Sequence, residues 1–296
     1  AICTGCCSTR RYNSVLMADL SNYKLPEGNV VISFSGGRTS GYMLHQIAEA
    51  NGGIPDRCVV SFQNTGREMP ETLDFVNRCS ESWGIDIKWL EWMNPKPKFQ
   101  IVSHDTAARN GEPFEALIRQ KHFLPNIRAR FCTSELKVLT AKRYLRSLGW
   151  DRWTNTVGIR FDEQRRLGKE DKDRWVTWHP LALDGIVKKD ISDFWNAQSF
   201  DLQLPNVNGS CWLGNCDGCF LKSESTLSHL AREYPERHMW WQDMEDLTSE
   251  WRLGNGSRFR LEYSRRQIKW NVENQGDWIF DTEDALCQVD HGECTE

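Results

Sequence analysis

The strongest constraint on the fold is the segment of residues 30–50, where an apolar run, a Ser-Gly-Gly turn and a helical pattern follow one another directly. Residues 30–34 (VVISF) are rich in β-branched side chains, which predicts a buried strand. The helix is expected from about Ser40 to Ala50. The two glycines let the backbone turn sharply and approach a ligand without an obstructing Cβ atom. The segment therefore predicts a strand–loop–helix unit.

The same alternation of strand and helix continues along the chain. Further strands are expected at residues 58–62, 85–90, 153–159 and 175–178. Helices are expected to start at Pro70, after an N-cap at Thr133 or Ser134, and after an N-cap at Asp190. This order predicts the α/β class: a doubly wound, mostly parallel, Rossmann-like sheet. Residues 93–113 show little periodicity and are predicted to form a long functional loop.

Charge and hydropathy exclude two broad classes of protein. The net charge is −4, so any nucleic-acid contact would need a local basic patch. Mean hydropathy is −0.61 and no apolar run reaches about 18 residues, so no transmembrane helix is expected. The first twenty residues lack the apolar core of a secretory signal, and we interpret residues 1–16 as an upstream extension before Met17. The eleven cysteines are therefore expected in the reducing cytoplasm, where clustered thiols bind metal or do chemistry.

The turn between the first strand and helix has the features of an anion site. Free amides at a helix start, together with the helix dipole, attract negative charge. Hydroxyls and one arginine add donors, so the predicted contacts are Ser35, Gly36, Gly37, Arg38, Thr39 and Ser40. The spacing fits neither the Walker pattern nor G-x-G-x-x-G. The alternative is an ordinary tight turn with a helix cap.

This turn resembles the PP-loop of the adenine nucleotide α-hydrolase-like superfamily, and the wider pattern resembles the phosphoadenylyl-sulfate (PAPS) reductase family. The matching segments are Phe62-Gln63-Asn64-Thr65-Gly66 with Pro70-Glu71-Thr72, Phe131-Cys132-Thr133 with Lys137, Val157-Gly158-Ile159-Arg160 with Asp162-Glu163 and Arg165-Arg166, and His179-Pro180-Leu181 with Trp195. They keep the family's order and cover roughly residues 28–222. The resemblance implies a nucleotide-binding PP-loop domain at 28–204, after an extension at 1–27 and before a metal-cluster loop and helical cap at 205–296.

The resemblance also implies an activity. A PAPS reductase-like enzyme binds PAPS or adenylyl sulfate and reduces or transfers the sulfur group, as an oxidoreductase of sulfur metabolism. Beyond the glycine turn, the implied nucleotide contacts are Asn64, Thr65, Gly66, Arg160 and Arg165. Two alternatives stay open: ATP-dependent sulfur transfer in nucleic-acid modification, of the ATP pyrophosphatase type, and a non-catalytic nucleotide or redox sensor. Thr39 stands where the ATP-cleaving relatives carry Asp, which disfavours the first alternative.

The arginines beyond the fourth strand suit phosphate or sulfate, because guanidinium binds such anions through two parallel hydrogen bonds. Arg160 follows that strand directly and is the strongest predicted ligand contact and catalytic group. Arg128, Arg130 and Lys137 are weaker candidates. The alternative is a solvated loop of internal ion pairs.

The run Cys211, Cys216 and Cys219 has the spacing C-x4-C-x2-C, three-quarters of a plant-type iron–sulfur motif. The family resemblance suggests Cys132 as the fourth ligand, with Cys287 in reserve. An iron–sulfur cluster, as 4Fe-4S, is favoured over structural zinc and over free thiols.

Two features near the C-terminus complete the list. PAPS reductases attack the sulfonyl sulfur with a C-terminal cysteine, which thioredoxin or glutaredoxin then resolves, and Cys294 is the corresponding candidate nucleophile here, a frayed tail being the alternative. Basic and aromatic residues interleave over residues 258–270, which can bind nucleic acid. We favour a solvated helix over a core for this stretch, so nucleic acid is not the favoured partner.

Overall fold

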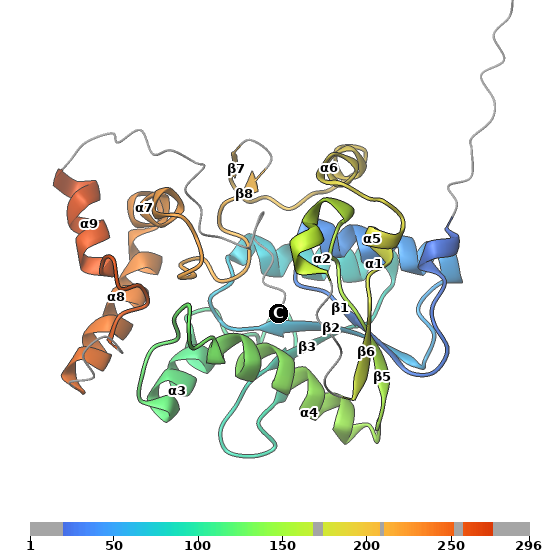
Figure 1. Ribbon diagram of the computed structural model, residues 1–296, viewed down its shortest axis with the longest axis horizontal. Coiled ribbons are helices and arrows are strands. Elements are labelled where there is room, and N and C mark those ends of the chain that lie inside the picture. Colours follow the sequence, from blue (N-terminus) through green and yellow to red (C-terminus); the bar gives the residue numbers. More distant parts are fainter. Residues whose placement is uncertain (1–19, 168–173, 208–209, 252–256, 275–296) are drawn as a thin grey trace, which may run out of the picture.

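The computed structural model describes residues 20–167, 174–207, 210–251 and 257–274. A six-stranded sheet of order β4-β3-β2-β1-β5-β6 lies at its centre (Figure 1). Its strands are β1 (Val30–Ser33), β2 (Cys58–Asn64), β3 (Ile87–Glu91), β4 (Gln100–Val102), β5 (Trp153–Thr156) and β6 (Trp175–Trp178). Neighbouring strands are parallel except β3 and β4, which are antiparallel. The predicted mostly parallel sheet is confirmed.

Helices cover both faces of this sheet, because successive side chains of a strand point to opposite faces. Val30 and Ile32 belong to the larger core together with residues of α1 and α2. Val31 belongs to a separate core with Tyr144 and Leu145 of α4. The helices are α1 (Arg38–Asn51), α2 (Pro70–Trp83) and α4 (Thr140–Ser147). Figure 1 shows α1 and α2 above the sheet and α4 below it, so the doubly wound class is confirmed.

The remaining elements flank the sheet. Within the described ranges they are η1 (Ser21–Tyr23), α3 (Glu112–Lys121), η2 (Thr133–Leu139), η3 (Phe161–Arg166), α5 (Pro180–Leu183), α6 (Lys188–Asn196), β7 (Asn206–Val207), β8 (Ser210–Cys211), α7 (Glu224–Glu233), α8 (Pro235–Glu250) and α9 (Arg265–Asn274). Helices α7 and α8 are separate, because Pro235 begins a new helix. Helices α7, α8 and α9 lie together at the left of Figure 1, as the predicted helical C-terminal region.

Three local predictions were wrong. The predicted long loop at residues 93–113 contains β4 and the start of α3. An edge strand of three residues is too short to show an alternating pattern of apolar residues in the sequence. Thr133 is no N-cap, because Cys132 before it already has helical backbone angles. Asp190 lies inside α6, where its carboxylate accepts a hydrogen bond from the Val187 amide at 2.9 Å. The domain boundaries at 27/28 and 204/205 stay a prediction.

Membrane insertion of a helix finds no support in the described ranges: none of their helices combines the length and the apolar character that a membrane crossing requires.

Candidate functional site

The glycine loop (residues 35–40) is shaped by a close packing contact that only glycine allows. Gly36 has φ +80°, and a Cβ atom there would lie 2.8 Å from Cγ2 of Thr72 and 3.1 Å from Cγ2 of Val76. Gly37 then precedes the first residue of α1, and no side chain caps that helix. The first amides of α1 are therefore left to bind something else, and the helix dipole makes an anion the natural ligand.

Hydroxyl groups support the loop from within. The Ser40 hydroxyl donates to the carbonyl oxygen of Gly37 at 3.0 Å and lies 3.0 Å from the Ser35 hydroxyl. The Ser35 amide donates to the same Ser40 oxygen at 3.2 Å. Ser40 and Thr39 are buried. The Ser40 hydroxyl therefore stabilises the conformation of the turn through hydrogen bonds within the loop.

The side chain of Arg38, in the glycine loop, forms an ion pair with Asp201. Its Nε and Nη2 donate to the two carboxylate oxygens of Asp201 at 2.7 and 2.6 Å. The Arg38 carbonyl oxygen accepts from Nε1 of Trp195 at 2.8 Å. That indole also packs on Gly41, where a Cβ atom would lie 2.8 Å from the ring. The segment around residue 200 therefore anchors the start of α1.

Arg160 reaches the glycine loop, as its place after β5 predicts. Its side chain is 3% exposed, and Nη1 donates to the Thr39 hydroxyl at 3.3 Å. Asp162 accepts from Nε at 2.9 Å, and the Arg160 amide donates to Glu163 at 3.0 Å. The expected convergence of the loop and the arginine segment is thus present, within a network of ion pairs. Arg165 is exposed instead.

The end of β2 carries a buried polar network that the sequence did not reveal. Asn64 donates to Oε1 of Glu91 at 2.6 Å and to the carbonyl oxygen of Ala108 at 2.8 Å, and its own oxygen accepts from the Gly66 amide at 3.1 Å. Thr65 donates to Glu68 at 2.8 Å. The amide of Asn64 is therefore used to hold the turn.

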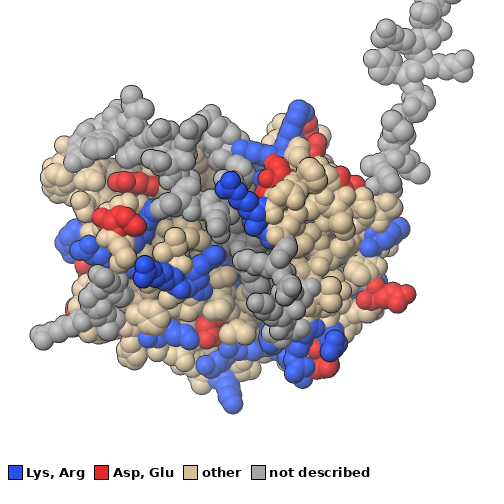
Figure 2. Space-filling view, in the orientation of Figure 1, with Lys and Arg blue, Asp and Glu red and all other residues tan. Residues whose placement is uncertain are grey.

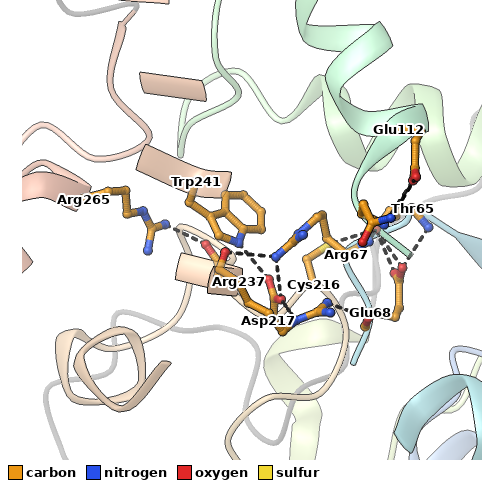
Figure 3. Close-up of polar contacts among 11 residues, drawn as sticks. Thr65, Arg67, Glu68, Glu112, Cys216, Asp217, Arg237, Trp241 and Arg265 are labelled. Atoms are coloured by element: carbon orange, nitrogen blue, oxygen red, sulfur yellow. Dashed lines mark hydrogen bonds and ion pairs between the residues drawn. The ribbon is translucent and has the colours of Figure 1, made fainter. Parts of the chain in front are cut away.

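The cysteine loop (residues 211–219) is attached to this turn by a buried charge network (Figure 3). Asp217 is 0% exposed; its carboxylate accepts from Nη2 of Arg67 at 2.9 Å, from Nε1 of Trp241 at 2.7 Å and from Arg237. Its amide donates to the carbonyl oxygen of Arg67 at 2.9 Å. Arg265 completes the network by donating to the carbonyl oxygen of Gly218 at 2.6 Å.

Two cysteines of the cysteine loop, Cys211 and Cys216, have neighbours that can stabilise a thiolate. The Thr65 hydroxyl lies 3.3 Å from Sγ of Cys216. Burial raises the pKa of Cys211, while the charges of Lys222 and Arg38 and the amides of Gly214 and Leu213 lower it. Lysine and backbone amides of this kind offset thiolate charge.

The four cysteines predicted to bind a metal all contact the larger hydrophobic core. Among the residues that the structure describes, no three His, Cys, Asp or Glu side chains are arranged to hold a metal ion. No disulfide joins Cys132, Cys211, Cys216 and Cys219 to one another. Lys137, in the helical run that follows Cys132, reaches the cysteine loop and donates to Asn215 at 3.1 Å. The donor chemistry of these four side chains fits a thiolate-bound metal, and the ligand set stays a prediction.

Several predictions fall outside the described residues. Cys287 and Cys294 lie there, as do residues 1–16.

The expectation of a solvated helix at residues 258–270 was wrong for its central arginine. Arg265 is buried, with its guanidinium 5.4 Å from the centre of the Trp241 ring. Glu245 accepts from the Arg265 amide at 2.7 Å. Burial lowers the pKa of Arg265, and the charge of Glu245 opposes that effect. This arginine therefore belongs to the interior and is not available to nucleic acid.

A family model described as the phosphoadenosine phosphosulfate reductase domain matches residues 29–177. An uncharacterized nin region protein of Escherichia phage lambda, ORF290, is 34% identical over 212 residues, which is 69% of each chain.

Two solved structures are also similar. The PAPS reductase of Candida auris, in a phosphate complex, has 16% identity and a TM-score of 0.39, over 60% of this chain and 75% of that one. A U34-tRNA thiolase of Methanococcus maripaludis, with its [4Fe-4S] cluster, has 14% identity and a TM-score of 0.35, over 75% and 72%.

Proposed function

Because this chain belongs to the phosphoadenosine phosphosulfate reductase domain family, we propose that it binds PAPS or adenylyl sulfate and reduces or transfers its sulfur group. One observation carries the proposal: the uncapped start of α1 at the glycine loop lies beside the buried guanidinium of Arg160. Amides and a guanidinium in one place suit the phosphoryl and sulfonyl oxygens of such a nucleotide.

The chain's own residues would act mainly by binding and charge balance. Amides after Gly37 would hold the phosphoryl oxygens, and Ser40 would keep their geometry fixed. Arg160 would offset charge that develops on the leaving phosphate, because its side chain is already oriented by Asp162 and Thr39.

The sulfur step that we propose uses the thiolate of Cys294. It attacks the sulfonyl sulfur, a sulfur–sulfur bond forms, the sulfur–oxygen bond to the nucleotide phosphate breaks, and the phosphate leaves with the electron pair. A dithiol protein such as thioredoxin or glutaredoxin then reduces the S-sulfocysteine. Sulfite is released, the Cys294 thiol returns, and the donor becomes a disulfide.

An iron–sulfur cluster held by Cys132, Cys211, Cys216 and Cys219 is part of the proposal, with zinc as the competing metal. When bound, it would organise the site and add an electrostatic field near the sulfate of the substrate. The donor set and the neighbouring Lys222 support it. No disulfide joins the six described cysteines to one another, which supports a reducing compartment such as the cytoplasm.

The decisive experiment compares binding of ATP, PAPS and adenylyl sulfate by calorimetry, using protein purified anaerobically and assayed for iron and sulfide. We expect the sulfated nucleotides to bind, Arg160→Gln to weaken them at least tenfold, and the exposed Arg232→Gln control to change nothing. If the protein preferred ATP and formed AMP and pyrophosphate, the result would instead support ATP-dependent sulfur transfer in nucleic-acid modification. Tight binding without turnover would make it a sensor.

A further inference from the structure

Positive charge is concentrated in one segment of this acidic chain. Residues 119–152, the basic segment, contain nine Lys and Arg against two Asp and Glu, a net charge of +7 where the whole chain has −4. The segment runs from the end of α3 through η2 and α4 to the start of β5. In Figure 2, Lys and Arg side chains gather along the lower edge of the molecule, where Figure 1 places α3 and α4.

Part of this charge is neutralised locally and part is open. Glu135 pairs with Lys121 and Arg143, and Asp151 pairs with Arg146. Arg128 and Arg152 are exposed, and neither has a side-chain partner among the described residues. The open charges therefore stand at both ends of the segment, with η2 and α4 between them.

The unpaired guanidinium of Arg130 indicates which kind of ligand this segment would bind. Its Nε and Nη2, the two nitrogens on one edge of the guanidinium, are shielded from water and have no hydrogen-bond partner within the described ranges. This edge is the one that binds two oxygens of a phosphate or carboxylate at once. A dry, unpaired guanidinium edge is unfavourable, so a turn of the Arg130 side chain toward an anion at the surface would be stabilising.

The extent of the surface decides the size of the ligand. Residues 133–147 form one continuous helical run, about 20 Å long at roughly 1.5 Å per residue. A small anion would meet one arginine, whereas a chain of phosphates can meet charges at both ends of that run. The side chain of Ile127, 62% exposed next to Arg128, adds apolar surface for a base.

The basic segment also leads toward the cysteine loop. Cys132 lies two residues after Arg130, and Lys137 donates to Asn215 between Cys211 and Cys216. From these observations we propose that the basic segment binds a nucleic-acid strand along α4, with one phosphodiester on Arg130. The inference is independent of the nucleotide proposal, because it uses no residue of the glycine loop.

The test measures anisotropy of a labelled 20-nucleotide single-stranded RNA, the same sequence as DNA, and 20-residue polyglutamate, each with the full chain at 50–200 mM KCl. We expect Arg128→Gln/Arg152→Gln to weaken oligonucleotide binding about tenfold and to reduce the slope of log K against log salt by about 1.4, roughly 0.7 for each lost phosphate contact. Arg130→Lys keeps the charge and should weaken binding several-fold with the slope unchanged.

The matched control is Lys189→Gln/Arg266→Gln, which makes the same change in net charge at side chains that are 79% and 69% exposed on α6 and α9. It should leave binding within twofold of wild type, with all variants melting at the same temperature. Three results would overturn the proposal: no oligonucleotide binding by wild type, equal weakening by both double variants, or equally tight binding of polyglutamate, which would assign the surface to an acidic protein.

Discussion

The glycine loop and the cysteine loop are held in place by opposite kinds of interaction. The first is fixed by close packing of backbone on apolar atoms, as at Gly36 against Thr72 and Val76. The second is fixed by buried charge, as at Asp217 between Arg67 and Arg237. A closely packed site loses stability when the volume of a side chain changes, and it does not depend on pH. A buried ion pair loses stability when one partner is removed or changes its protonation state. Substitutions can separate the two.

The largest effect is expected from Asp217→Asn. The change leaves the buried Arg67 without its counter-charge, which should lower the free energy of unfolding by about 3–5 kcal/mol. Asp246→Asn is the control, because this exposed carboxylate pairs with Arg266 at 2.8 Å and should contribute under about 1 kcal/mol. Urea unfolding of both variants measures the difference. Equal losses would mean that the buried network does not hold the cysteine loop.

The second effect is expected from Gly36→Ala. A left-handed φ disfavours alanine by about 1 kcal/mol, and the clash with Thr72 adds overpacking, for a total of about 3 kcal/mol. Gly149→Ala has a similar φ of +83° with open space around its Cβ position, so it should show the first contribution alone. Thermal unfolding compares the two. If they lost stability equally, close packing would not shape the glycine loop.

The two loops also differ in how far the sequence could predict them. The glycine loop is local: the apolar run at 30–34, two glycines and a helix stand side by side, so strand, turn and helix could be placed correctly. The cysteine loop depends on pairs such as Arg67 with Asp217, separated by 150 residues, and no spacing signals them. Arg67 and Glu68 follow the second strand directly, but the sequence does not show that both side chains are buried.

The same limit explains the two basic stretches. Interleaved arginines at 258–270 suggested a surface, yet the burial of Arg265 depends on Trp241 and Glu245 from another helix. Conversely, the charge of residues 119–152 is plain in the sequence, but the sequence does not show which of these side chains are paired. Whether a charge is interior or exposed is decided by tertiary contacts.

The third effect is the pH dependence expected from His238, which lies beside the buried charge network. Burial, followed by the charge of Arg265, lowers the pKa of His238 to about 4, so the folded state keeps this ring neutral while the unfolded state protonates near pH 6.5. The unfolded state therefore binds more protons between these values, and stability falls as the pH falls from 6.5 toward 4. From pH 7 to pH 5 the loss should be about 2 kcal/mol.

The variant for this measurement is His238→Gln, whose amide can replace the ring nitrogen that lies 2.9 Å from the carbonyl oxygen of Arg265. Wild type and variant share every other titrating group. Urea unfolding at pH 5, 6 and 7 should give the variant a flatter profile by that amount, and parallel profiles would remove His238 as the cause.

The smallest effect is expected at the ion pair between Arg38 of the glycine loop and Asp201, which lies between α6 and β7. This ion pair has good bidentate geometry, but its side chains are 23% and 25% exposed, so water screens it. A double-mutant cycle of Arg38→Gln and Asp201→Asn should give a coupling of about 1 kcal/mol in unfolding free energy. A coupling near zero would show that the pair does not anchor the start of α1.

If Arg38 also binds phosphate, Asp201→Asn releases Arg38 for the ligand and should tighten nucleotide binding while lowering the free energy of unfolding. Opposite signs in those two measurements would distinguish a ligand contact from a purely structural pair, in which both would fall together.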